Sequence, residues 1–143
     1  MQGESRMHIA IVYDSSTGKT RKAAETMSTI LEGHGHQCKV QSAYDADPAE
    51  VAKADLILLG GWVKGLFVIR QHPSDGAMWF IDQLGDMAGT KVALFCTYML
   101  AAGSTLDQMV QPLEGKGAEI IGRFKYRGSE PDRAFASFAE SLN

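Results

Sequence analysis

The sequence HIAIVYDSSTGKT, residues 8–20, joins a continuous apolar run to a loop of short hydroxyl side chains. An apolar run such as His8–Tyr13 is typical of a strand that is buried on both faces. Apolar residues at helical spacing follow from Gly18 to Gly33, so the loop leads into the amino end of a helix. Such a helix end offers unpaired N–H groups and the positive end of the helix dipole. Together with the hydroxyl groups and the conformational freedom of Gly18, this predicts a phosphate site over residues 15–20.

Strand-like and helix-like segments alternate along the rest of the chain with short connections. Further strands are expected over residues 37–43, 55–60, 91–96 and 119–126, each followed by a helix. Five such units predict a parallel sheet with helices on both faces and right-handed crossovers. Five strands favour the order 2-1-3-4-5, in which ligands bind at the point between strands 1 and 3 where the strand order reverses. The loops after strands 1, 3 and 4 are therefore expected to meet at one site.

The hydroxyl-rich loop has two other interpretations. A helix cap with no ligand would use the same Ser and Thr side chains. The nucleotide-binding P-loop also ends in Gly-Lys-Thr, as residues 18–20 do, but it requires a glycine where Tyr13 stands. No magnesium-binding Asp is evident after a second apolar strand, so the P-loop interpretation is disfavoured.

The pattern Ser15-x-Thr17-Gly18-x-Thr20 resembles the phosphate loop of flavodoxins, S/T-x-T-G-x-T. Residues 12–15, Val-Tyr-Asp-Ser, are also similar to the flavodoxin domain of flavodiiron proteins. The resemblance runs from Met7 to Leu142 in element order and loop placement. It implies a flavodoxin-like three-layer α/β sandwich that binds FMN, with a five-stranded parallel sheet of order 2-1-3-4-5 between helices. Lys19 departs from the family pattern, because flavodoxins often have Asn there, and it adds a charge near the phosphate.

Two further loops carry residues that suit a flat aromatic ring. Residues 60–62 (Gly-Gly-Trp) follow the third expected strand, and residues 97–99 (Thr-Tyr-Met) follow the fourth. Stacking stabilises such a ring by roughly 0.5–1.5 kcal/mol per aromatic pair, and the resemblance implies that Trp62 and Tyr98 flank the isoalloxazine ring of FMN. The alternative for each is an ordinary packing role. The expected cofactor-binding residues are Ser15, Ser16, Thr17, Gly18, Lys19, Thr20, Gly60, Gly61, Trp62, Val63, Thr97, Tyr98, Met99 and Gly103.

Residues 61–75 are expected to form a long apolar loop, because they contain glycines, Pro73 and no clear period. This segment is longer than a minimal flavodoxin loop. It can cover the flavin, form a surface for a partner, or serve dimerisation.

Length and composition limit the other possibilities. The 143 residues suit one flavodoxin-like FMN-binding domain over residues 7–143, after a disordered tail or expression remnant at residues 1–6. The formal net charge of −3 argues against a nucleic-acid partner, and no apolar run approaches the roughly 18 residues that span a membrane. Two cysteines in a domain with a full core are expected to be free thiols in a cytoplasmic protein. Residues 34–38 (His-Gly-His-Gln-Cys) are interpreted as a surface turn, so no metal site is expected.

These observations favour an FMN-binding electron-transfer flavoprotein that shuttles electrons between redox proteins. The expected partners are a flavin reductase and a ferredoxin-type donor or an acceptor oxidoreductase, and no catalytic residue is expected. Two alternatives remain open: a small FMN-dependent NAD(P)H reductase of quinones or nitro compounds, with Phe67 and His72 lining its substrate pocket, and a flavin-free interaction module of the same fold. Bound flavin separates the last from the others, and NADPH oxidation by the isolated protein separates the reductase from the carrier.

Overall fold

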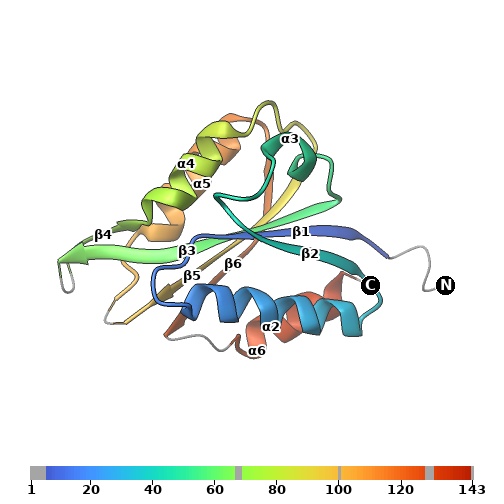
Figure 1. Cartoon of the computed structure of the whole chain (residues 1–143), viewed down its shortest axis with the longest axis horizontal. Helices are drawn as coiled ribbons and strands as arrows, with labels where there is room; N and C mark the ends of the chain where they lie inside the picture. Colours follow the sequence, from blue (N-terminus) through green and yellow to red (C-terminus); the bar gives the residue numbers. More distant parts are fainter. Residues whose placement is uncertain (1–5, 67–68, 100, 128–130, 143) are drawn as a thin grey trace.

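A twisted sheet lies between two layers of helices (Figure 1). This computed structural model describes residues 6–66, 69–99, 101–127 and 131–142. The elements are β1 (His8–Tyr13), α2 (Lys19–Gly33), β2 (Gln37–Ser42), α3 (Pro48–Val51), β3 (Leu56–Leu66), β4 (Ile69–Pro73), α4 (Asp75–Gln83), β5 (Lys91–Tyr98), α5 (Thr105–Gly115), β6 (Glu119–Arg127) and α6 (Arg133–Ser141). Within these ranges, none of the helices has the length and apolar character that crossing a bilayer requires.

Five of the strands form a parallel sheet in the order β2-β1-β3-β5-β6. Counted among the parallel strands alone, this is the predicted order 2-1-3-4-5, so the predicted α/β fold class is confirmed. The sixth strand, β4, pairs antiparallel with β3 outside this path and was not among the five predicted strands. The chain order of the strands reverses between β1 and β3, and their carboxyl ends lie on the left of Figure 1.

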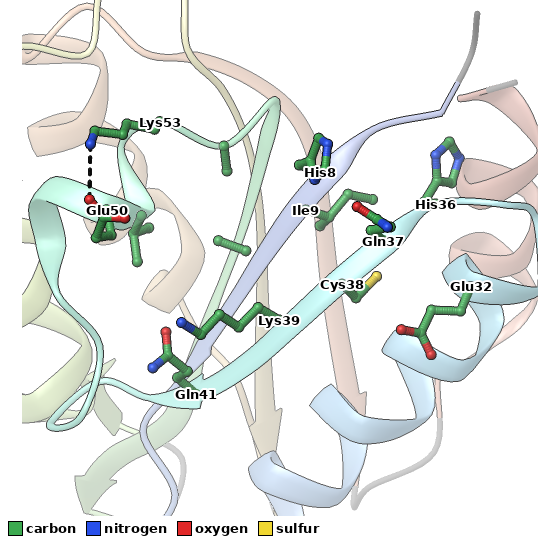
Figure 2. A pocket seen from close by; sticks show the side chains of 13 residues that line it. His8, Ile9, Glu32, His36, Gln37, Cys38, Lys39, Gln41, Glu50 and Lys53 are labelled. Carbon is green, nitrogen blue, oxygen red and sulfur yellow. Dashed lines mark hydrogen bonds and ion pairs between the residues drawn. The ribbon is translucent and has the colours of Figure 1, made fainter. Parts of the chain in front are cut away.

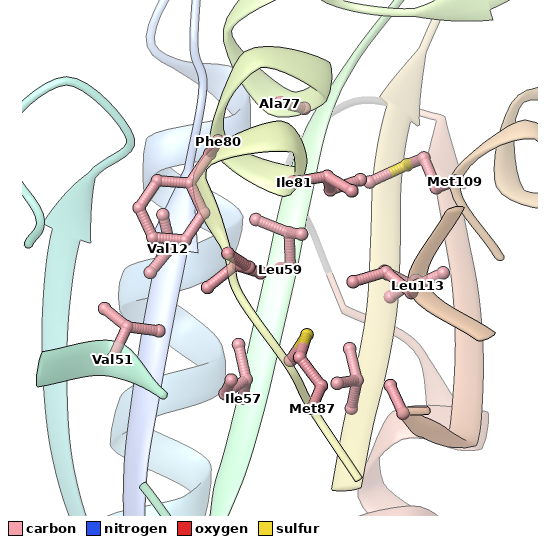
Figure 3. Packing of buried hydrophobic residues seen from close by; sticks show 14 of the residues in the cluster. Val12, Val51, Ile57, Leu59, Ala77, Phe80, Ile81, Met87, Met109 and Leu113 are labelled. Atoms are coloured by element: carbon pink, nitrogen blue, oxygen red, sulfur yellow. The ribbon is translucent and has the colours of Figure 1, made fainter. Parts of the chain in front are cut away.

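Helices α4 and α5, with the short α3, cover one face of the sheet (Figure 1). Ile81 of α4 lies beside Met109 of α5, and Phe80 of α4 lies beside Val12 of β1 (Figure 3). These side chains belong to one buried cluster with Leu59 of β3 and Leu113 of α5. Residues at helical spacing on each helix thus supply the apolar side that the sheet requires. This packing fixes where α4 and α5 begin, at the carboxyl edge of the sheet.

Helices α2 and α6 cover the opposite face (Figure 1). Met27 and Leu31 of α2 and Phe135 of α6 belong to a second buried cluster with Phe95 of β5. The rings of Phe124 and Phe135 meet edge to face with their centroids 5.2 Å apart, a favourable arrangement of aromatic rings. Because helices cover both faces, the central strands are apolar on both sides, as the continuous apolar runs predict.

Residues 61–75 form a hairpin and the start of a helix, so the prediction of a long loop is wrong. Strand β3 continues without a break as far as Leu66, the chain returns as β4, and α4 begins at Asp75. Gly61, taken in the sequence as a sign of a loop, lies inside β3 and pairs with β5, as Gly60 does. Pro73 ends β4, which has β3 as its only partner strand among the described residues, and proline is tolerated at such an edge.

Gly60 is required by packing. It lies beside Phe95 of the neighbouring strand, and a Cβ atom at position 60 would collide with the Phe95 ring. That ring is fully buried, and close-packed protein interiors leave little space into which a side chain can move. The glycine thus reflects close contact between strands rather than a turn.

We predict that Gly60→Ala lowers the free energy of unfolding by about 2 kcal/mol, because overpacking a filled core costs about 1–3 kcal/mol. Urea unfolding measures the change. Gly33→Ala is the matched control: it has open space at the end of α2 and leaves stability unchanged or raises it by up to about 1 kcal/mol. The second change Phe95→Leu restores part of the loss. Equal stability of the Gly60→Ala and Gly33→Ala variants contradicts the packing explanation.

Candidate functional site

A cavity of about 520 Å³ opens at the carboxyl edge of the sheet, beside the point where strand order reverses. This is where doubly wound sheets bind their ligands, and the volume is typical of cofactor pockets. Three segments far apart in the sequence form it: the loop after β1 with the start of α2, the β3–β4 hairpin, and the end of β5 with the loop that follows. The lining residues are Ser16, Thr17, Lys19, Thr20, Trp62, Val63, Lys64, Gln71, Thr97, Tyr98, Met99 and Ala101.

The loop after β1 is shaped for an anion. The hydroxyl of Ser15 accepts a hydrogen bond from the N–H of Gly18 at 3.0 Å, which closes the loop on itself. Gly18 caps α2 with a φ of 92°, a conformation that glycine adopts without strain. The side chains of Ser16, Thr17 and Lys19 remain exposed. Hydroxyl donors, a cation and the amino end of α2 thus face the same cavity.

A buried hydrogen bond joins this loop to β5. The hydroxyl oxygens of Thr20 and Thr97 lie 2.7 Å apart, and both side chains are almost fully buried. A hydroxyl group can donate one hydrogen bond and accept two, so each retains capacity for a ligand. The contact sets the distance between the start of α2 and the end of β5, which are two walls of the cavity.

Two aromatic side chains form the other end of the cavity. Trp62 and Tyr98 are half-buried at the ends of the neighbouring strands β3 and β5, where Trp62 pairs with Thr97. Each ring has a cation near it: Lys64 Nζ lies 5.8 Å from the centre of the Trp62 ring, and Arg127 Cζ lies 5.8 Å from the centre of the Tyr98 ring. These distances are within the range of cation–π contacts.

Nine of the fourteen expected cofactor-binding residues line this cavity together: Ser16, Thr17, Lys19, Thr20, Trp62, Val63, Thr97, Tyr98 and Met99. The other five lie outside the lining. Ser15 and Gly18 shape the loop, and Gly60 makes room for Phe95. A Cβ atom at Gly61 would lie 2.5 Å from Ser74 Oγ, and one at Gly103, whose φ is 57°, would lie 2.8 Å from Gln71 Cβ. Four of the five are therefore glycines with backbone or packing roles.

Sequence reasoning missed Lys64, Gln71 and Ala101 as lining residues. Lys64 and Gln71 reach the cavity because the β3–β4 hairpin folds back beside it. The apolar residues 66–69, between Trp62 and Pro73, were the only local sign of that hairpin.

Asp14 is a further residue that the motif did not reveal. It is almost fully buried, and its carboxylate accepts a hydrogen bond of 3.1 Å from the N–H of Gly76 in the first turn of α4. Its own N–H donates to the carbonyl of Gly60 at 3.0 Å. A carboxylate is stabilised at a helix amino end. Asp14 thus ties the loop after β1 to both β3 and α4.

The cysteine thiols do not form a reactive centre. Burial raises the pKa of the Cys96 thiol to about 12 and that of the Cys38 thiol to about 11. Both groups are therefore protonated at neutral pH, and protonated thiols are poor nucleophiles and metal ligands. In the described ranges no group of three or more His, Cys, Asp or Glu side chains is placed to hold a metal ion.

A second cavity, of about 660 Å³, lies along the starts of β1 and β2 beside α3 (Figure 2). Its lining includes His8, Cys38 and Lys39, and the ion pair Glu50–Lys53, with 2.9 Å between Nζ and Oε2, lies at one side. These positions are at the amino ends of the strands. The loop after β1, the hairpin and the aromatic residues all face the other cavity, which is therefore the candidate functional site.

The family model described as Flavodoxin matches residues 11–138. The chain belongs to the flavodoxin family. The flavodoxin of Megasphaera elsdenii is 30% identical to it over 114 residues, which cover 80% of this chain and 82% of that protein. The flavodoxin of Clostridium beijerinckii is 27% identical over 125 residues, or 87% of this chain and 88% of that one.

Solved structures agree with this assignment. The two-electron-reduced M. elsdenii flavodoxin superimposes with a TM-score of 0.80 at 28% identity and covers 94% of this chain and 97% of its own. The flavodiiron protein of Giardia intestinalis matches in fold with a TM-score of 0.71 at 10% identity, with 99% of this chain covered and 36% of that one. Flavodoxins are small flavin-binding electron carriers that act with redox partners, and FMN is the cofactor.

The candidate site fits this cofactor. Ser16, Thr17 and Lys19 provide donors and a positive charge for a phosphate group at one end. Trp62 and Tyr98 provide aromatic faces for a flat ring at the other. The cavity is thus polar where FMN is anionic and aromatic where FMN is flat.

We predict that the Thr20–Thr97 contact stabilises the fold before any cofactor binds. Thr20→Val and Thr97→Val are each expected to cost about 1–2 kcal/mol, because each leaves a buried hydroxyl without its partner. The double variant is expected to lose clearly less than the sum of the single losses. Urea unfolding of the apoprotein measures this cycle, with exposed Thr29→Val as the control. Strictly additive losses mean that the two hydroxyl groups do not interact.

Proposed function

We propose that FMN binds in the cavity at the carboxyl edge of the sheet, with its phosphate at the loop of residues 15–20 and its ring between Trp62 and Tyr98. The observation that carries this proposal is the gathering of nine expected residues from three distant segments around one cavity. The hydroxyl groups of Ser16 and Thr17 and the amino end of α2 bind the phosphate. Lys19 adds a charge there that the family motif often lacks.

We further propose that the chain carries electrons between redox proteins. Bound FMN supplies the chemistry, since it accepts and donates one or two electrons. The side chains around the ring hold it and exclude water from its faces. Met99, which is 74% exposed, lies beside Tyr98 at the mouth of the cavity, so one side of the site is open to a docked partner. A flavin reductase, a ferredoxin-type donor and an acceptor oxidoreductase are partners of the expected kind, and two free thiols support a reducing, cytoplasmic location.

The reductase alternative has less support from the site. His72 is not among the lining residues, and its ring Nδ1 lies 3.1 Å from the carbonyl oxygen of Pro73. Phe67, the other residue assigned to a substrate pocket, lies outside the described residues. The carrier is therefore the function that the site supports best.

If the phosphate of FMN binds at the loop of residues 15–20, changes in the loop are expected to weaken FMN, which has a phosphate, more than riboflavin, which has none. Ser16→Ala combined with Thr17→Val is expected to raise the Kd for FMN at least about tenfold, because hydrogen bonds to a charged group are worth about 1.5–3 kcal/mol each. The Kd for riboflavin is expected to change less than about twofold. Fluorescence titration of the apoprotein with both ligands measures this, and Thr29→Val is the control. If both ligands weaken equally, the phosphate does not lie at this loop.

The carrier assignment predicts how the holoprotein takes up electrons. Slow photoreduction followed by visible absorbance is expected to show two resolved one-electron steps. The isolated protein is expected to oxidise NADPH negligibly in the presence of a quinone, and rapidly once a flavin reductase is added. Rapid NADPH oxidation by this chain alone would identify the reductase instead, and a purified chain that binds no flavin would leave only the interaction module.

A further inference from the structure

The lining of the cofactor cavity carries positive charge and no negative charge. It contains Lys19 and Lys64, and none of its twelve residues is Asp or Glu. The chain as a whole has a formal net charge of −3, so this local balance is opposite in sign to the average. Lys19 belongs to the phosphate end, which leaves Lys64 as the lysine at the aromatic end.

Lys64 is held in place by two contacts. Its Nζ lies 3.0 Å from the Asp75 carboxylate, in an ion pair between the hairpin and the start of α4. The same Nζ lies 5.8 Å from the centre of the Trp62 ring. Asp75 is 82% exposed and is not part of the lining, whereas Lys64 is 34% exposed and is. Lys64 therefore contributes to the cavity lining, whereas its counter-ion Asp75 does not.

Arg127 adds a second cation at the same end. Its guanidinium carbon lies 5.8 Å from the centre of the Tyr98 ring, and Arg127 pairs with Tyr98 in the register of β6 with β5. Arg127 is exposed at the end of β6, and within the described residues no carboxylate forms an ion pair with it. Both proposed ring walls thus carry a positive charge.

Reduction changes the charge of a flavin ring. Uptake of two electrons and one proton from a redox partner and solvent converts neutral oxidised flavin to a ring with one negative charge, while the charge of the phosphate group is the same in both states. A nearby cation interacts more favourably with the anionic ring than with the neutral one. A nearby carboxylate has the opposite effect.

We propose that Lys64 sets the redox poise of this flavodoxin by favouring the reduced, anionic flavin, and that Asp75 limits this effect through its ion pair with Lys64. The inference rests on the proposed position of the ring between Trp62 and Tyr98. Arg127 acts in the same direction as Lys64. Lys64 is a positioning and charge-supplying residue and takes no part in proton transfer.

The experiment compares the binding of oxidised and reduced FMN by the full-length chain. In Lys64→Gln, the Kd for reduced FMN is expected to rise about three- to tenfold more than the Kd for oxidised FMN, as expected for a charge several ångströms away in a partly screened site. A tenfold change in this ratio corresponds to a fall of about 30 mV in the two-electron midpoint potential. Equilibrium redox titration of the holoprotein measures the same quantity independently.

Asp75→Asn supplies the decisive comparison. It removes the opposing charge and leaves Lys64 in place. The Kd for reduced FMN is therefore expected to fall relative to the Kd for oxidised FMN, and the midpoint potential is expected to rise. A purely structural role of the ion pair predicts shifts of the same sign in both variants, because each breaks the same contact. Shifts of the same sign therefore overturn the proposal.

Two further variants complete the test. Arg127→Gln is expected to shift the potential in the same direction as Lys64→Gln. Lys91→Gln makes the same change in net charge at the start of β5, at the other edge of the sheet, and is expected to leave the potential unchanged. All shifts are expected to shrink as ionic strength rises. An equal shift in Lys91→Gln overturns the local assignment.

The results distinguish failure of the proposed role of Lys64 from failure of the proposed FMN site. If Lys64→Gln leaves both Kd values unchanged while Ser16→Ala with Thr17→Val still separates FMN from riboflavin, the phosphate assignment stands and the role of Lys64 is wrong. A chain that binds no FMN overturns both.

Discussion

The pairing of β3 with both β1 and β5 is the constraint on which the site depends. Its register places Gly60 beside Tyr13 on one side and Phe95 on the other, and it places Trp62 beside Thr97. A slip of one residue would turn every side chain of β3 to the opposite face. The three segments that form the cavity therefore meet because the backbone hydrogen bonds of the central strands align them, and the buried clusters on both faces hold that alignment.

The part of the fold that the sequence predicts is the part encoded by local periodicity. Apolar runs gave the parallel strands, helical spacing gave the helices, and the connection rules gave their order. The hairpin was missed because Gly61 and Pro73 are ordinarily signs of a loop. Here Gly61 is explained by close packing against Ser74 and Pro73 by an edge position, and both conditions depend on contacts that the local sequence does not show.

The same distinction divides the candidate site. The residues of the loop after β1 follow one another in a motif, so sequence alone could propose them. Lys64 and Gln71 reach the cavity only through the pairing of β3 with β4, and Asp14 acts through a contact with Gly76 sixty-two positions away. No short pattern encodes such contacts. The phosphate end can thus be predicted from the sequence, whereas the charges around the aromatic end are found only from the three-dimensional structure.

The hairpin also affects the entropy of binding. Trp62 and Lys64 stand on a continuation of the central strand, and the carbonyl of Gln71 in β4 accepts a hydrogen bond of 2.9 Å from the Gln108 side chain of α5. This wall is therefore ordered by the sheet and by a helix before a ligand arrives. The ligand does not have to supply the free energy that orders a side chain, about 0.5–1.5 kcal/mol for each flexible one. That cost falls on the exposed side chains of Ser16, Thr17 and Lys19, so the aromatic end of the cavity is a preformed surface and the phosphate end is the part that adjusts.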